Sequence, residues 1–156
     1  MGETEEFLAS VLPRLTAADT AIHDGDAAPR KALWSRHDPV TLYGAAMMAT
    51  GWPGIEATFD WLASTFSDCT RFDIEVVAAG ASGDLAYLVA FERTTASLGG
   101  APPAAYSLRV TTVFRREAGE WKAVHRHADA LPDSAATRDR LAALRDGAEG
   151  EARGPS

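Results

Sequence analysis

The chain has 156 residues, 46% of them hydrophobic and 24% charged, which predicts one globular domain with a core of its own. A net charge of −7 excludes the basic field that attracts nucleic acids or anionic membranes, and the single Cys69 excludes an internal disulfide framework. No apolar run approaches the roughly 20 residues of a membrane span, and the first residues are acidic, unlike a secretory signal. We therefore expect a cytoplasmic protein with no nucleic-acid and no membrane partner.

Apolar residues recur at helical spacing in the first half of the chain. A first helix is expected to begin at Thr4 and to end near Ile22, and Pro13 should kink or split it. Asp24-Gly25-Asp26 predicts a stop and a restart, because Gly25 suits the left-handed exit from one helix and an aspartate can cap the next. After this second helix we expect a short strand at 40–43, a loop at 44–53 and a third helix from residue 54.

From residue 71 onward the period of the pattern changes from 3.6 to 2, which predicts long strands. Helices followed by a meander of strands are typical of an α+β fold with the helices on one face of the sheet. We expect three N-terminal helices packed on a curved antiparallel sheet, a cone-shaped arrangement that encloses a pocket. The domain should span residues 4–130, and residues 131–156 should form a tail with a short helix at 135–145 and a disordered end. The predicted strands cover residues 72–79, 85–97, 106–116 and 121–130.

The sheet face turned away from the helices should carry Tyr87, Val89 and Phe91. An apolar face that nothing covers usually marks an interface. We therefore expect a homodimer that forms through the outer sheet face.

The last predicted strand carries the candidate chemistry. Because successive strand side chains point to opposite faces, Trp121, Ala123, His125, His127 and Asp129 should share one face. That face runs from an apolar end to two imidazoles and a carboxylate, which fits the wall of a half-polar cavity. We expect His127 and Asp129 to be catalytic, since an imidazole titrates near neutrality and burial can raise the pKa of a carboxyl group to join it. The alternative interpretation is structural: His127 would hydrogen-bond a side chain of a neighbouring strand, and Asp129 would cap the end of its own strand.

The sequence leaves open which face of strand 106–116 lines the pocket, because the turn before the last strand decides the register. The polar set better matches His127 and would place Arg109 in the cavity, where it could bind an anionic or carbonyl oxygen. The alternative is that Arg109 faces solvent or an interface. Glu92 on the strand before should line the same cavity or neutralise Arg109. The polar set is Ser107, Arg109, Thr111 and Val113, and the other is Tyr106, Leu108, Val110, Thr112 and Phe114.

Aromatic side chains should supply the apolar part of the lining, because ligand sites are mostly apolar. His125 is a further candidate for ligand contact, whereas His23 should complement the dipole of the first helix. His125-x-His127-x-Asp129 also has the spacing of a strand metal site for iron or zinc, which is an alternative; we expect neither a metal nor a cofactor. The aromatic candidates are Trp34, Tyr43, Trp52 and Trp61.

Several short stretches accompany the predicted order of three helices, a short strand and four long strands, namely Asp24-Gly25-Asp26, Leu33-Trp34-Ser35, Asp38-Pro39-Val40-Thr41-Leu42, Gly51-Trp52 and residues 121–127. Together these features resemble the nuclear transport factor 2-like superfamily, and most closely its small SnoaL-like proteins common in actinobacteria. The resemblance implies a deep cavity and usually a dimer, but no single activity, because the scaffold serves enzymes and binding modules alike. Asp129 lies near the position of the late-strand carboxylate that SnoaL-type cyclases use. The first helix lacks the tyrosine that ketosteroid isomerases place there, which argues against that activity.

Two functions are compatible with these residues. The first is a cofactor-free enzyme that performs acid–base chemistry of the isomerase, cyclase or dehydratase type on a small apolar oxygenated substrate. In it, His127 and Asp129 would face Arg109. The alternative is a non-catalytic dimeric ligand-binding or assembly module, in which the same polar residues fix a unique core.

Overall fold

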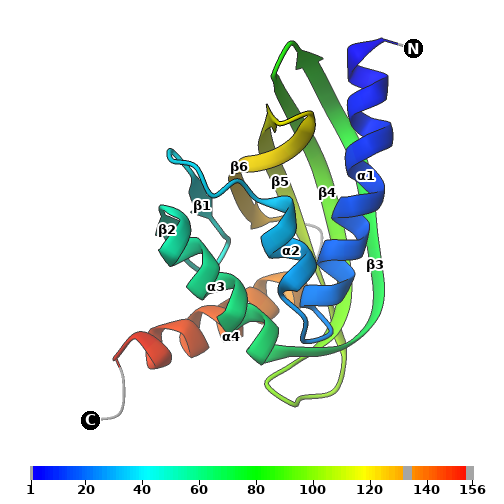
Figure 1. Cartoon of the computed structure of the whole chain (residues 1–156). Coiled ribbons are helices and arrows are strands. Elements are labelled where there is room, and N and C mark those ends of the chain that lie inside the picture. Colours follow the sequence, from blue (N-terminus) through cyan, green and yellow to red (C-terminus); the bar gives the residue numbers. More distant parts are fainter. Residues whose placement is uncertain (1, 132–134, 154–156) are drawn as a thin grey trace.

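The computed structural model describes residues 2–131 and 135–153, with the helices mostly before the long strands (Figure 1). The α+β class expected from the sequence is confirmed. The helices are α1 (Glu3–Ile22), α2 (Ala28–Leu33), α3 (Trp52–Thr65) and α4 (Ala135–Arg153). The strands are β1 (Thr41–Tyr43), β2 (Met48–Thr50), β3 (Phe66–Ser82), β4 (Leu85–Leu98), β5 (Ala104–Glu117) and β6 (Glu120–Ala130).

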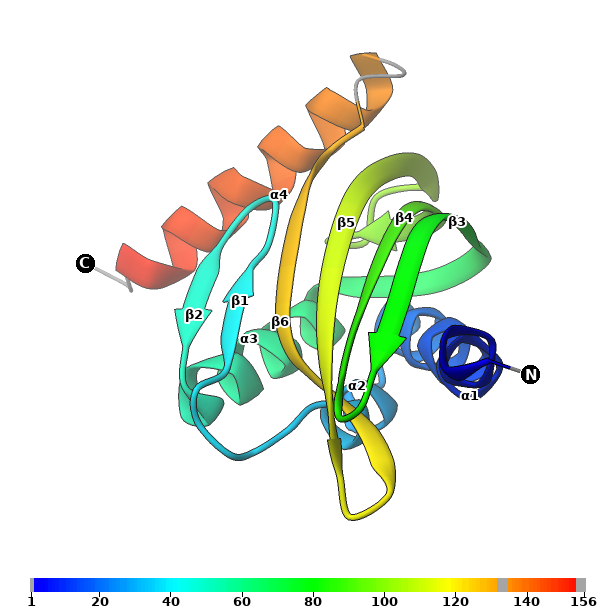
Figure 2. The same ribbon diagram turned by 90° about the horizontal axis from the view of Figure 1, so that it is seen from above.

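The strands form one curved sheet in the order β2-β1-β6-β5-β4-β3. The pairs from β3 to β6 are antiparallel, whereas β1 pairs with β6 in parallel and carries β2 as its antiparallel neighbour. Figure 2 shows α1, α2 and α3 on one side of this sheet, while α4 leaves the end of β6 and runs past the β1–β2 hairpin. The curved sheet and its helices therefore leave an inner face, a bare outer face and one end that α4 covers.

The core lies between the first three helices and the inner sheet face. Phe7 of α1 packs edge-on against Phe114 and Trp121, with 5.2 Å between ring centroids in each pair. On β4, alternate residues from Ala86 to Thr94 are all buried, as the period of 2 predicts. A second, smaller cluster joins inner-face residues of β4 to β6 to Leu141 and Leu144 of α4, so α4 belongs to the packed structure.

Several element boundaries differ from those expected. The first helix is not split, since α1 continues through Pro13. The loop expected at 44–53 contains β2 and the first two residues of α3, where Pro53 is tolerated because its missing N–H would have had no helical partner. The C-terminal helix continues to Arg153, well beyond the expected residue 145. The part of the expected disordered end that remains, residues 154–156, lies outside the described residues.

No helix among the described residues is both long and apolar enough to span a bilayer. The cytoplasmic location stays a prediction.

Candidate functional site

A β-bulge in β6 decides which of its side chains face the core. Val113 pairs with His125 and Phe114 with Ala123, so Val124 is an extra residue between them. Trp121 and Ala123 are buried before the bulge, whereas Arg126 and Ala128 are buried after it. The prediction that one face carries Trp121, Ala123, His125, His127 and Asp129 is therefore wrong, because the extra residue shifts the alternation by one.

The face of β5 that was preferred for the pocket is also turned outward. The register pairs Arg109 with Asp129 and Thr111 with His127, so the polar set does match the histidine strand. That shared face, however, points away from the core, and the buried set is Tyr106, Leu108, Val110, Thr112 and Phe114. Arg109 and Asp129 are 55% and 60% exposed and form an ion pair at 2.9 Å. The hydrogen bond from Arg109 lowers the pKa of Asp129, which contradicts the expectation that burial would raise it.

The histidines of the expected site contact an exposed tyrosine on the same outer face. His127 is exposed and His125 half-buried, and the Tyr43 ring lies edge-on to both, at 5.8 and 5.4 Å between centroids. Thr41 Oγ1 and His125 Nδ1 are 2.7 Å apart and hydrogen-bonded. The catalytic roles of His127 and Asp129 stay predictions, but these residues do not lie at the cavity described below.

The four remaining candidates are dispersed around the fold. Glu92 is buried on β4, but its partner is Arg126 rather than Arg109. Trp34 is buried against Phe59, the Trp52 ring lies under the Arg36 guanidinium, and Trp61 flanks a surface groove beside α4. None of the nine residues expected at the site lines the cavity described next.

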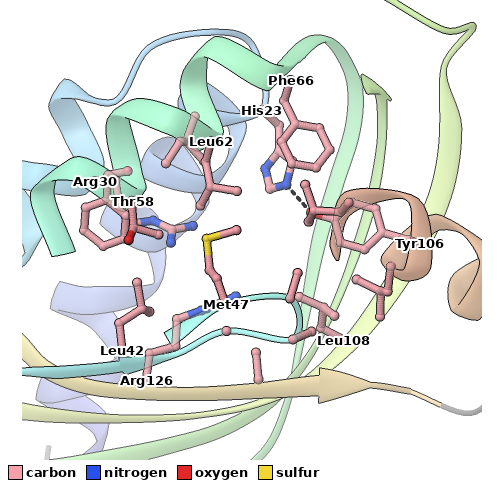
Figure 3. A pocket seen from close by; sticks show the side chains of 18 residues that line it. His23, Arg30, Leu42, Met47, Thr58, Leu62, Phe66, Tyr106, Leu108 and Arg126 are labelled. Atoms are coloured by element: carbon pink, nitrogen blue, oxygen red, sulfur yellow. Dashed lines mark hydrogen bonds between the residues drawn. The ribbon is translucent and has the colours of Figure 1, made fainter. Parts of the chain in front are cut away.

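A cavity, called the principal cavity below, lies where α3, α4, the loop after β1 and the inner sheet face meet (Figure 3). Its volume is about 70 Å³, and most of its lining is aliphatic or aromatic. Five polar side chains interrupt this apolar wall. The Thr58 hydroxyl donates to the Gly54 carbonyl group of its own helix, and the other four are His23, Arg30, Tyr106 and Arg126. An apolar cavity with a few convergent polar groups is the usual form of a small-molecule site. The lining residues are Ile22, His23, Arg30, Leu42, Gly44, Ala45, Ala46, Met47, Thr58, Phe59, Leu62, Phe66, Tyr106, Leu108, Arg126, Ala128, Leu141 and Leu144.

His23 and Tyr106 form a buried pair at one side of this cavity (Figure 3). His23 Nδ1 lies 2.7 Å from the backbone carbonyl oxygen of Asp19, which can only accept a hydrogen bond, so Nδ1 carries the proton. His23 Nε2 is therefore the acceptor for the Tyr106 hydroxyl. Burial lowers the pKa of His23 to about 4 and raises the pKa of Tyr106. At neutral pH both groups are uncharged, and the tautomer of the imidazole is set.

Two buried ion pairs flank this pair of residues. Arg126 on β6 donates two hydrogen bonds of 2.9 Å to the Glu92 carboxylate on β4. Burial alone would raise the pKa of Glu92, but the charge and hydrogen bonds of Arg126 lower it. Arg30 on α2 donates to the carboxylate of Asp19 on α1, and burial together with Arg126 lowers the pKa of Arg30 to about 9. Both guanidinium groups reach the cavity wall, so positive charge is available there in an apolar setting.

None of the five polar lining residues was among the site residues expected from the sequence. Arg126 sits between two histidines and would face outward without the bulge, and Tyr106 belonged to the set judged less suitable. His23 follows the last residue of α1, where the terminal carbonyl groups lack helical partners, and its ring folds back to one of them. From the sequence, His23 was expected to complement the helix dipole, which requires a protonated imidazole, whereas the buried ring is neutral. The sequence could not predict that His23 lies among buried charged residues, because those residues come from other elements of the fold.

Among the described residues, no group of three or more His, Cys, Asp or Glu side chains is placed to hold a metal ion. The alternative metal site at His125, His127 and Asp129 thus lacks such a geometry.

Solved structures with the same architecture define the class of fold. A Streptomyces avermitilis protein, provisionally described as a dehydratase of the NTF2-like family, is 19% identical with a TM-score of 0.64, covering 81% of this chain and 97% of its own. An NTF2-like protein of unknown function in nutrient uptake from Rhodospirillum rubrum is 22% identical with a TM-score of 0.62, covering 80% and 98%. A Thiobacillus denitrificans domain, provisionally described as a calcium/calmodulin-dependent protein kinase type II association domain, is 20% identical with a TM-score of 0.56, covering 79% and 90%. The fold is that of the NTF2-like superfamily, as the sequence predicted.

The family model of the SnoaL-like domain matches residues 11–132. The chain therefore belongs to the SnoaL-like domain family. No protein of curated function matches it by sequence. The similar structures include proteins described as a dehydratase and as an association domain. Membership of the family therefore defines the fold but not the activity, which depends on the residues of the cavity.

Proposed function

We propose that the protein binds a small, largely apolar molecule carrying an oxygen acceptor in the principal cavity and acts on it by proton transfer without a cofactor. One observation carries this proposal: a neutral His23, with its tautomer set, accepts a hydrogen bond from Tyr106 at the wall of an apolar cavity. A neutral imidazole is a base, and the neighbouring guanidinium groups would stabilise negative charge that develops on a substrate oxygen.

Each polar residue has a distinct role in this chemistry. Arg30 and Arg126 would attract the carbonyl or hydroxyl oxygen of the ligand and stabilise an enolate formed from it. Tyr106 would take the proton from the carbon beside the carbonyl while its own hydroxyl proton moves to His23 Nε2. The products of this step are an enolate and an imidazolium, and returning the proton elsewhere on the molecule completes an isomerisation, or supports a dehydration or an aldol-type cyclisation.

A probe that needs no knowledge of the natural substrate tests this step. In D₂O, the protein should accelerate exchange of the protons of 2-butanone beside the carbonyl above the rate in buffer, as measured by loss of their ¹H NMR signals. Tyr106→Phe and His23→Gln should each lower the protein-dependent rate by roughly 10²-fold or more, the usual contribution of a general acid–base group.

The outer face supplies matched controls. Tyr43→Phe removes the same hydroxyl from an exposed tyrosine, and His127→Gln makes the same change as in His23 on the outer face. Both should keep the wild-type rate. A loss confined to His127→Gln would instead assign the chemistry to the site first expected from the sequence.

A non-catalytic binding module is the second candidate, because each buried cation is already paired with a carboxylate inside the protein. A network of this kind can fix a unique core without turnover. Binding of 2-butanone in the cavity with exchange no faster than in buffer would favour this candidate.

We also propose a homodimer formed through the outer sheet face. Leu85 and Tyr87 on β4 are 59% and 46% exposed on that face, and Val89 and Phe91 beside them are half-buried. Burying these side chains against a second copy would remove apolar surface from water.

A further inference from the structure

The cavity contains a wall that does not come from the part of the chain that matches the family. The match ends at residue 132, and α4 begins at Ala135. Leu141 and Leu144 of α4 are nevertheless 4% and 8% exposed, and both line the cavity. An addition to the family domain thus completes the site.

Hydrogen bonds join α4 to the sheet and to the loop after β1. The Ser107 backbone N–H donates to Thr137 Oγ1 at 3.0 Å, and Arg140 donates to the carbonyl oxygen of Ala96. Arg145 Nη2 lies 3.4 Å from the carbonyl oxygen of Ala45, which itself lines the cavity. These contacts come from three different segments, so the position of the helix relative to the cavity is defined.

The contribution of α4 to the cavity is entirely apolar. The five polar lining residues lie at the end of α1 and on α2, α3, β5 and β6, whereas α4 provides two leucine side chains. A ligand whose oxygen lies at Arg30, Arg126 or Tyr106 must place its hydrocarbon part against the remaining walls. Leu141 and Leu144 occupy space into which a longer hydrocarbon chain would extend.

We propose that Leu141 and Leu144 determine specificity by setting the length of the apolar chain that the cavity accepts. This inference rests on the proposed function in one respect, that the ligand occupies the principal cavity. Because Leu→Ala in a packed site removes side-chain atoms and leaves space behind, either substitution should lengthen the cavity toward α4.

A homologous series of methyl ketones, from 2-butanone to 2-octanone, provides the test with the full chain. Dissociation constants measured by ligand-observed NMR should pass through an optimum for the wild-type protein. In Leu141→Ala and Leu144→Ala the optimum should move to a ketone longer by about two carbon atoms, with at least tenfold tighter binding of that ketone.

Leu88→Ala is the matched control, because Leu88 is a buried leucine of β4 that does not line the cavity. It makes the same deletion in the core and should leave the optimum unchanged, whereas a merely structural role of the α4 leucines would change all three variants alike. An unchanged optimum in both α4 variants, or an equal change in Leu88→Ala, would overturn the inference.

Xenon separates this inference from the proposed function, because xenon enters apolar cavities without needing an oxygen acceptor. If no ketone binds to any variant, the proposed function fails and crystals under xenon pressure decide the role of α4. Xenon in the space vacated by Leu144, continuous with the cavity at Leu108 and Ala128, would support the inference. A vacated space that is refilled or separated from the cavity would overturn it.

Discussion

A histidine that is 7% exposed and donates to a backbone carbonyl group is neutral at pH 7, and this charge state makes the cavity suitable for chemistry. Desolvation penalises the imidazolium, while Glu92 and Arg126 oppose each other in their effect on it. A neutral His23 accepts from Tyr106, and a protonated one could not. The hydrogen-bonded pair therefore exists only where the imidazole has lost its proton.

The depressed pKa of His23 predicts a loss of stability in mild acid. Between its pKa of about 4 in the folded protein and the usual 6.5, the unfolded chain binds more protons than the folded one. The contribution is thus fully present above pH 6.5 and falls as the pH drops toward 4, by about 3 kcal/mol in total. Urea unfolding from pH 7 to pH 4.5 should show a smaller loss for His23→Gln than for wild type, and the wild-type loss for His127→Gln. Parallel profiles for all three proteins would contradict a neutral buried His23.

The Glu92–Arg126 pair predicts an asymmetry between single and double substitutions. Arg126→Met leaves a buried carboxylate without its partner and should cost about 3–5 kcal/mol of unfolding free energy. Glu92→Gln combined with Arg126→Met removes both charges and should cost less than Arg126→Met alone. Arg109→Met breaks an exposed pair and should cost no more than about 1 kcal/mol in the same denaturation experiment. A double variant as unstable as Arg126→Met would mean that the lost charge pairing is not the cause.

At the scale of the element, one extra residue in β6 separates the expected site from the cavity. The hydrophobic pattern predicted the strand and its approximate ends, because alternation survives on either side of Val124. It could not predict the bulge, since no glycine or proline marks it and its effect depends on pairing with β5. The sequence also could not predict which face of β5 is buried, because either set of alternate residues could face the core. Only the pairing of β5 with its neighbours shows that Tyr106 points inward.

Deleting Val124 tests whether this residue is the extra one that shifts the alternation. Without it, regular pairing from Trp121 and Ala123 would place His125 outside and keep Arg126 inside, so the ion pair with Glu92 should persist. The deletion should therefore cost much less unfolding free energy than Arg126→Met, as measured by urea unfolding. Deleting Gly100, in the exposed β4–β5 connection, is the control for shortening the chain by one residue. A Val124 deletion as destabilising as Arg126→Met would show that Arg126 no longer reaches Glu92 and would contradict this role of the bulge.

At the scale of the whole molecule, the class and order of elements followed from pattern alone, because 3.6-residue and two-residue periods occupy separate halves of the chain. The pattern did not predict the short β2 or the full length of α4. Residues 48–50 are too few to show alternation, and α4 is rich in charged residues, so its apolar stripe is sparse. The cavity forms only where β2 and α4 pack near the sheet, and that packing depends on the tertiary structure rather than on the local sequence pattern.

The bare outer face predicts the state of the protein in solution. Sedimentation equilibrium should give twice the 16.6 kDa chain mass. Tyr87→Arg places a charge in the apolar patch and should shift the equilibrium to the monomer, whereas Thr16→Arg on the exposed side of α1 should not. A wild-type monomer at micromolar concentration would contradict the dimer but leave the cavity unaffected.

The most direct test of the cavity as the ligand site uses the four histidines, His23, His37, His125 and His127, as reporters in one titration. Ring ¹⁵N chemical shifts are followed while 2-butanone is added at pH 7. We predict that the His23 resonances, which should show a proton on Nδ1, move with saturation while those of His125 and His127 stay constant. Saturable changes at His125 and His127 with a silent His23 would contradict the central claim and place the ligand on the outer sheet face.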